Sequence, residues 1–232
     1  TAPTWGFKDV LFKGNDLELN QPYATYTMEN ILFKISFPAE FHAQTAVECA
    51  ITLHRQMQDQ GKSLDDIQSI LLETQESGDR IINKTGPLDN PADRDHCLQY
   101  MVSIGLIKGS LEAEDYEDDV AADPRIQKLR DKMTVRENER FTREYLEPDK
   151  RAIGNRIEIA FSDGSSISES VDYPVGHRRR RSEGIPLLKE KFERYLRGCL
   201  SPKNADAVLG ICASQSSFEQ TRVNDLMDLF VV

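Results

Sequence analysis

Apolar residues recur at helical spacing in three long parts of the chain, which predicts three amphipathic helices. The first spans residues 40–61 and ends at Gly61, a typical stop signal. Its apolar face consists of Ala46, Cys49, Ala50, Leu53 and Met57. The second follows Asp93, which can cap it, and closes at Gly109. The third carries an apolar stripe at Leu188, Phe192, Tyr195, Leu196, Cys199 and Leu200.

Shorter helical patterns fill much of the remaining chain. The acidic run 112–119 and the pair Asp123-Pro124 each start a short helix, because proline fits the first helical turn. We expect the second of these to carry Ile126, Leu129 and Met133 on its inner face. Residues 205–213 and 225–230 predict final helices. Residues 1–30 mix aromatic and turn-forming residues and predict an irregular connection, with a short helix or strand at residues 7–12.

The spacing changes to strand-like alternation in three places. Residues 67–74 predict a strand. Residues 156–161 and 166–171 also alternate, and Asp163-Gly164 between them is a strong hairpin signal. The resulting order of elements predicts an α+β fold over about residues 30–180, followed by a helical tail.

Charge and cysteine usage narrow the possible functions. The net charge of −10 disfavours nucleic acid as a partner, and a small anionic substrate then needs a local basic cluster. Cys49, Cys97 and Cys199 fall in apolar helical patterns without metal-ligand spacing, so we expect buried structural thiols. No run approaches the 18–20 or so apolar residues that span a bilayer. The chain opens on Thr1 without a start signal, and we expect it to be a piece of a longer protein.

Lys34, Glu40 and His42 lie within nine residues, just before the first long helix. The free N–H groups at a helix start suit a carboxylate ligand. The alternative is a solvated lysine and a capping glutamate.

His96 and Tyr100 lie four residues apart in the second helical pattern, which predicts that they share one face. A tyrosine can transfer protons when a cation lowers its pKa. The alternative is a buried tyrosine with a satisfied hydroxyl.

Four successive arginines, Arg178 to Arg181, form the third candidate cluster. They can clamp carboxylates, or else form a solvated basic loop; phosphate or nucleic acid is a further possibility. The carboxylates of residues 112–119 do not match a calcium loop and are better explained as a solvated helix face.

Together, several segments resemble the MmgE/PrpD family. They include TAPTWGF (1–7), MENILFKISFPAEFHAQT (28–45), GPLDNPADRDHCLQYM (86–101), 111–119, 141–150 and YPVGHRRRRSEGIPLLKEKF (173–192). The resemblance implies a two-domain subunit with an MmgE/PrpD-like architecture. Residues 1–29 would end a helical-domain segment, 30–180 would form a lid-type α+β domain, and 181–232 would return to the all-helical domain.

The resemblance also implies an activity: dehydration of 2-methylcitrate to 2-methyl-cis-aconitate in the methylcitrate cycle of propionate catabolism, without metal or organic cofactor. Such a reaction gathers negative charge that cations stabilise, and it needs a general base and a general acid. The family's lysine corresponds to Lys34 and its tyrosine to Tyr100, while Glu40 or His42 stands where some relatives place a histidine. The candidate residues are Tyr100, Lys34 and His42 as catalytic groups, and Lys34, Glu40, His96, Arg178 and Arg179 as substrate-binding groups.

Other outcomes stay open. Gly105 and Lys108 depart from the family's pattern, which leaves the substrate preference open. A related cis-aconitate decarboxylase or aconitate-type hydro-lyase is one alternative, and a catalytically silent interaction or oligomerisation module is another. The resemblance implies a homodimer in the cytoplasm or mitochondrial matrix, and family active-site residues upstream of Thr1, so we expect the isolated chain to be inactive.

Overall fold

The computed structural model describes residues 2–16, 18 and 31–231, which fall into two compact units, 1–32 and 33–232. The first unit contains helix α1 (Phe7–Phe12), so the short element expected there is a helix. The rest of the irregular connection predicted up to residue 30 lies largely outside the described residues.

The second unit is built on a four-stranded sheet with the strand order β2-β1-β3-β4. Its strands are β1 (Ile67–Thr74), β2 (Met133–Glu137), β3 (Asn155–Phe161) and β4 (Ser166–Val171). β1 runs parallel to β2 and antiparallel to β3, and β3 and β4 form an antiparallel hairpin. The Asp163-Gly164 hairpin prediction is therefore confirmed, and so is the α+β class.

One face of the sheet is apolar because buried residues alternate along the two central strands. Ile70 and Leu72 of β1 face the core with Ile157 and Ile159 of β3. The opposite face is polar, and there Arg156 forms an ion pair with the neighbouring Glu73 (2.8 Å), as residues on one face of paired strands do.

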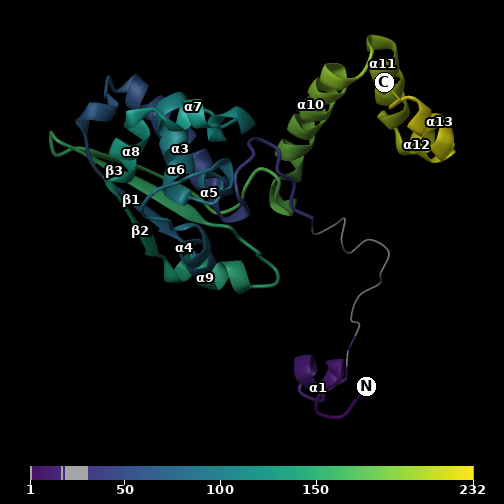
Figure 1. Cartoon of the computed structure of the whole chain (residues 1–232), viewed down its shortest axis with the longest axis horizontal. Helices are drawn as coiled ribbons and strands as arrows, with labels where there is room; N and C mark the ends of the chain where they lie inside the picture. The colour runs from purple at the N-terminus through teal and green to yellow at the C-terminus, as the bar shows by residue number, and fades with distance from the viewer. Residues whose placement is uncertain (1, 17, 19–30, 232) are drawn as a thin grey trace. The chain divides into compact units, whose positions relative to one another are not determined.

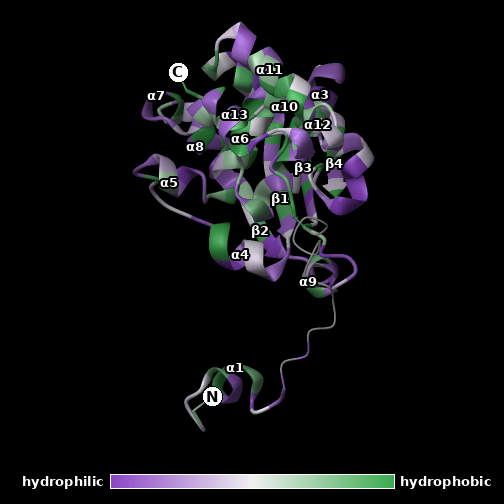
Figure 2. Ribbon diagram, turned by 90° about the vertical axis from the view of Figure 1, so that its right-hand side faces the viewer, coloured by the Kyte–Doolittle hydropathy of each residue, from purple (hydrophilic) through white to green (hydrophobic). Residues whose placement is uncertain are grey.

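Helices α3 (Gln44–Asp59), α6 (Leu98–Lys108) and α8 (Pro124–Arg130) pack over the apolar face, and Figure 1 shows them on one side of the sheet. The predicted apolar face of α3 is buried throughout. A Cβ on Gly105 of α6 would lie 2.8 Å from the Ala50 Cβ, so the glycine permits the close crossing of α3 and α6. Figure 2 shows hydrophobic colour along α6 and the strands next to it.

Four helices and four 3₁₀ turns complete the α+β part. The helices are α4 (Glu76–Ile82), α5 (Pro91–Arg94), α7 (Asp118–Ala121) and α9 (Glu139–Leu146). The 3₁₀ turns are η1 (Phe41–Ala43), η2 (Leu64–Asp66), η3 (Ala113–Tyr116) and η4 (Arg178–Arg180).

The predicted helix through Met133 was wrong at its end. α8 stops at Arg130, and Met133 begins β2, whose partner is β1. The Ile70 N–H donates to the Lys132 carbonyl (2.9 Å) where the two strands meet. Tertiary pairing therefore overrides the helical spacing.

The tail contains α10 (Arg181–Cys199), α11 (Pro202–Cys212), α12 (Gln215–Gln220) and α13 (Val223–Asp228). Leu196 of α10 packs with Ala205 and Val208 of α11 in a small apolar cluster. Cys49 and Cys97 are buried as expected, but Cys199 is exposed, because the short cluster covers only a narrow part of α10.

Candidate active site

The segment from Lys34 to Glu40 is extended, and its side chains alternate between the core and the surface. Ile35, Phe37 and Ala39 are buried, whereas Lys34 is exposed. The Gln44 side chain at the start of α3 donates to the Ala39 carbonyl (2.6 Å) and ties the segment to the helix. This alternation is what directs Lys34 outward.

Lys34 lies over an aromatic ring on the same segment. Its Nζ is 5.3 Å from the centre of the Phe41 ring, a cation–π distance. Its backbone carbonyl accepts a hydrogen bond from the Lys191 Nζ of α10 (2.6 Å). Burial, together with the charges of Arg194 and Lys34, holds the pKa of the Lys191 ammonium below its ordinary value. Lys191 is thus a second cation beside Lys34 that the sequence pattern did not single out.

Glu40 and His42 form a local pair. The Glu40 carboxylate accepts hydrogen bonds from the His42 backbone N–H (2.7 Å) and pairs with its Nδ1 (2.9 Å). Burial alone would raise the pKa of the Glu40 carboxyl, but the hydrogen bonds and charge interactions with His42 outweigh it, and His96 adds to them, so this pKa is lowered. A carboxylate bound to Nδ1 orients the imidazole and leaves Nε2 for another partner.

His96 does not share a helical face with Tyr100, and that prediction was wrong. α5 ends at Arg94 and α6 begins at Leu98, so His96 lies in the turn between them and is exposed. α5 is a four-residue helix capped by Asn90, and residues 95–97 separate it from α6. The His96 Nδ1 pairs with the neighbouring Asp95 carboxylate (2.5 Å), and His96 is a minor contributor to the lowered pKa of Glu40.

Tyr100 is buried inside α6, and its hydroxyl donates to the Asp115 carbonyl (2.6 Å). Its ring stacks on Tyr116 at 6.1 Å, and the Tyr116 hydroxyl donates to the Pro38 carbonyl (3.0 Å). Burial raises the pKa of Tyr100 to about 12, so the phenol keeps its proton at neutral pH. Tyr116, which the sequence pattern did not single out, connects Tyr100 to the Lys34–His42 segment.

The arginine turn, residues 176–181, meets the chain at Phe33, directly before Lys34. A Cβ on Gly176 would lie 1.7 Å from the Phe33 carbonyl oxygen, and the Phe33 N–H donates to the Gly176 carbonyl (3.3 Å). The Arg181 guanidinium lies 4.7 Å from the Phe33 ring centre. The structure therefore brings the Lys34 and arginine clusters together at the backbone.

Individual arginines of the turn have partners within the chain. Arg178 and Arg179 both donate to the Asp149 carbonyl (2.6 and 3.1 Å), and Arg179 lies over the Tyr173 ring. Arg180 bonds both oxygens of Glu48. These contacts fix the turn, and the substrate-binding roles of Arg178 and Arg179 stay predictions.

His177 is a further buried group in the turn. Its Nδ1 accepts a hydrogen bond from the Arg179 N–H (3.1 Å). Burial, reinforced by the charges of Arg178 and Arg179, lowers the pKa of the imidazole.

The acidic run differs from the expected solvated helix face at one residue. Asp115 is buried, forms an ion pair with Lys108 and accepts a hydrogen bond from the Glu112 N–H (2.8 Å). Because the Asp115 carbonyl holds the Tyr100 hydroxyl, this part of the run supports the candidate site. Among the described residues, no group of three or more His, Cys, Asp or Glu side chains is placed to hold a metal ion.

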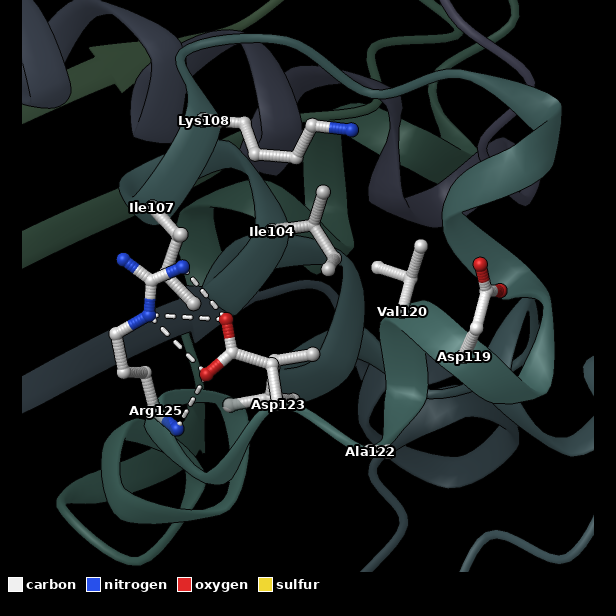
Figure 3. Close-up of a pocket in the computed structure, with 9 residues that line it drawn as sticks. Ile104, Ile107, Lys108, Asp119, Val120, Ala122, Asp123 and Arg125 are labelled. Carbon is white, nitrogen blue, oxygen red and sulfur yellow. Dashed lines mark hydrogen bonds and ion pairs between the residues drawn. The ribbon is translucent and has the colours of Figure 1, made fainter.

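Two pockets flank this region. A cleft of about 300 Å³ is lined by Ser36 and Phe37 on one side and by Glu48, Arg55 and Glu112 around it. A larger pocket of about 510 Å³ lies between α6, α7 and α8. Figure 3 shows its apolar floor at Ile104 and Val120, and its rim, where Arg125 is held by Asp123.

Comparison with known proteins identifies the class. Residues 37–215 match the family model described as the MmgE/PrpD C-terminal domain, and the chain belongs to the MmgE/PrpD family. Within the part of the chain described, no helix is long and apolar enough to cross a membrane.

The chain is also similar to individual proteins over its full length. The chain is 54% identical over its full length to "2-methylcitrate dehydratase, mitochondrial" of Yarrowia lipolytica, covering 44% of that protein. It is 52% identical over its full length to "2-methylcitrate dehydratase" of Salmonella typhimurium, covering 48% of it. A third relative, "2-methylcitrate dehydratase-like protein oryR" of Aspergillus oryzae, is 43% identical, with 47% covered. The chain spans about half the length of the curated relatives it matches.

Proposed function

We propose that this chain supplies the C-terminal-domain half of a metal-independent hydro-lyase that converts 2-methylcitrate to 2-methyl-cis-aconitate. The observation that carries the proposal is the identity of 51–54%, over the full length of this chain, to 2-methylcitrate dehydratases from bacteria and a yeast. The proposed compartment is the mitochondrial matrix or the cytoplasm, and the name of the Yarrowia relative places that protein in mitochondria.

The proposed chemistry removes a proton from carbon and expels the hydroxyl on the adjacent carbon as water. Negative charge develops on the neighbouring carboxylate, and Lys34 is proposed to stabilise it. His42, oriented by the Glu40 carboxylate at 2.9 Å, is the proposed proton-transfer group on this segment. His96, which is exposed and paired with Asp95, is proposed to contact a second substrate carboxylate.

Tyr100 is proposed as a proton donor rather than a base, a role in which its hydroxyl turns from the Asp115 carbonyl (2.6 Å) to the substrate. Its pKa of about 12, which burial raises, means that the phenolate is nearly absent at neutral pH. Arg178 and Arg179 are proposed to attract the tricarboxylate from the neighbouring turn. The polyanionic substrate needs this local positive charge because the chain as a whole carries a net charge of −10.

The direct test is a chimera in which this chain replaces the matching C-terminal segment of the Yarrowia lipolytica relative. We expect the chimera to form the unsaturated product from 2-methylcitrate, detected by its absorbance, without releasing carbon dioxide. The 232-residue chain alone should be inactive. Release of carbon dioxide from cis-aconitate would favour the decarboxylase, and a folded but inactive chimera would favour the silent interaction module.

The proposed partners are tested separately. We propose a homodimer and no nucleic-acid partner. Light scattering of the chimera should give twice the subunit mass, and a monomer would contradict the dimer.

A further inference from the structure

Arg94 is a buried cation whose charge is only partly balanced. Its side chain is 93% buried, yet its ion-pair partner Asp118 (2.7 Å) is 85% exposed. The other terminal nitrogen donates to the Tyr116 carbonyl (2.7 Å). The Nε of Arg94 is buried and has no hydrogen-bond partner among the described residues. Leaving a buried charged donor unpaired is costly, so such a group calls for an additional acceptor.

Arg130 at the end of α8 is in a similar state. Its terminal nitrogens donate to the Gln127 side chain (2.7 Å) and the Gly86 carbonyl (2.8 Å). Its Nε is also buried without a partner, and within the described ranges no carboxylate forms an ion pair with it. These contacts and a longer one to the Lys84 carbonyl (3.4 Å) are all with neutral oxygens, which leave the positive charge uncompensated.

The two arginines line one cavity. Its volume is about 120 Å³, and among the described residues its wall includes Arg94, Arg130, Tyr100 and Gln127 but no aspartate or glutamate. Burial raises the pKa of the Tyr100 phenol, which lines the same cavity, and the charges of Arg94 and Arg130 oppose that shift. A cavity of roughly 150 Å³ holds a benzene molecule, so this space is sufficient for a group of a few heavy atoms.

We propose that the Arg94–Arg130 cavity binds one compact oxyanion, either the carboxylate group of a small organic acid or inorganic phosphate. Two like charges beside one cavity, without a resident carboxylate inside it, repel each other until an anion enters. Arginine is suited to this ligand because its planar donors match the oxygens of a carboxylate or phosphate. The inference stands without the proposed dehydratase function, since binding is a property of the chain itself.

Arg125, on the same helix as Arg130, differs from it because it has a carboxylate partner. Both carboxylate oxygens of Asp123 accept bonds from its guanidinium, Oδ2 at 2.6 and 2.9 Å and Oδ1 at 3.1 Å, as Figure 3 shows. Its side chain is half-exposed. An arginine already satisfied in this way has no reason to recruit an external anion, so Arg125 is a matched control.

The first experiment follows the arginine Nε–H signals of the 232-residue chain by NMR while sodium acetate or sodium phosphate is added. Sodium chloride keeps the ionic strength constant. We expect saturable shifts of the Arg94 and Arg130 signals, and an unchanged Arg125 signal. Saturation with acetate alone identifies a carboxylate ligand, and saturation with phosphate alone identifies phosphate. The proposal is overturned if neither anion shifts the two signals, or if Arg125 responds equally.

Three variants test the same site by affinity. Arg130→Gln should weaken binding about tenfold, which corresponds to roughly 1.4 kcal/mol. Asp118→Asn should strengthen binding, because it removes the competing carboxylate from Arg94 at an exposed position that folding tolerates. Arg125→Gln should leave affinity unchanged. Unaltered affinity in both Arg130→Gln and Asp118→Asn would exclude this cavity as the binding site. If Arg130→Gln fails to fold, the NMR titration of the unmodified chain tests the proposal.

Discussion

Replacing Gly176 by alanine should separate the arginine turn from the Lys34 segment. The added Cβ would lie 1.7 Å from the Phe33 carbonyl oxygen and 2.6 Å from its carbonyl carbon, whereas ordinary contact begins at 3.4 Å. Both obstacles are backbone atoms, which cannot rotate away, so one of the two segments must move by well over an ångström. Overpacking of this kind costs about 1–3 kcal/mol, and loss of the Phe33–Gly176 hydrogen bond adds about 1 kcal/mol.

Urea unfolding of the 232-residue chain measures this cost. We expect Gly176→Ala to lower the free energy of unfolding by about 2–4 kcal/mol with an unchanged slope against urea. Gly210→Ala is the matched control, because nothing lies within 4 Å of its added Cβ inside α11. Alanine there should stabilise by up to about 1 kcal/mol. A Gly176→Ala variant as stable as the unmodified chain would show that the turn and the segment do not meet as described.

Two further substitutions test the contacts around the site. Tyr116→Phe keeps the ring but removes the donor to the Pro38 carbonyl (3.0 Å), and urea unfolding should show a loss of about 1 kcal/mol; no loss would exclude that hydrogen bond. Glu40→Gln should alter the acid dependence of stability. The folded-state pKa of Glu40 lies below its ordinary value of 4.5, so its stabilisation is present above that value and is lost as pH falls through the folded-state pKa. The stability difference between the unmodified chain and Glu40→Gln should therefore shrink below about pH 4.5 in acid unfolding curves, and a constant difference would contradict the Glu40–His42 pair.

The parts of the fold that the sequence predicted are those with local causes. The buried stripe of α3, from Ala46 to Met57, follows from helical periodicity alone. The β3–β4 hairpin follows from Asp163-Gly164 and the alternation beside it. β2 was missed because its pairing with β1 joins residues more than sixty positions apart, such as Ile70 and Met133. No local pattern records such a partner.

The candidate site shows the same limit. The residue types of the Lys34, His96–Tyr100 and arginine clusters were visible in the sequence, but the contacts between them were not. Tyr116 joins two clusters through a hydrogen bond across 78 positions, and Gly176 joins two through a steric requirement. Tyrosine and glycine occur throughout the chain for other reasons, so their positions alone carried no signal.

Lys34 is proposed to stabilise negative charge in a dehydratase built partly from this chain. The most direct test of this proposal is kcat/KM for 2-methylcitrate in the chimera, measured for Lys34→Gln and for the control Lys128→Gln, an exposed lysine paired with Asp65. Lys34→Gln should reduce kcat/KM by roughly 10²–10³-fold, as the loss of one charge-stabilising donor does, and the control should match the unmodified chimera. Equal turnover by Lys34→Gln and the control, with both proteins folded, would contradict the account.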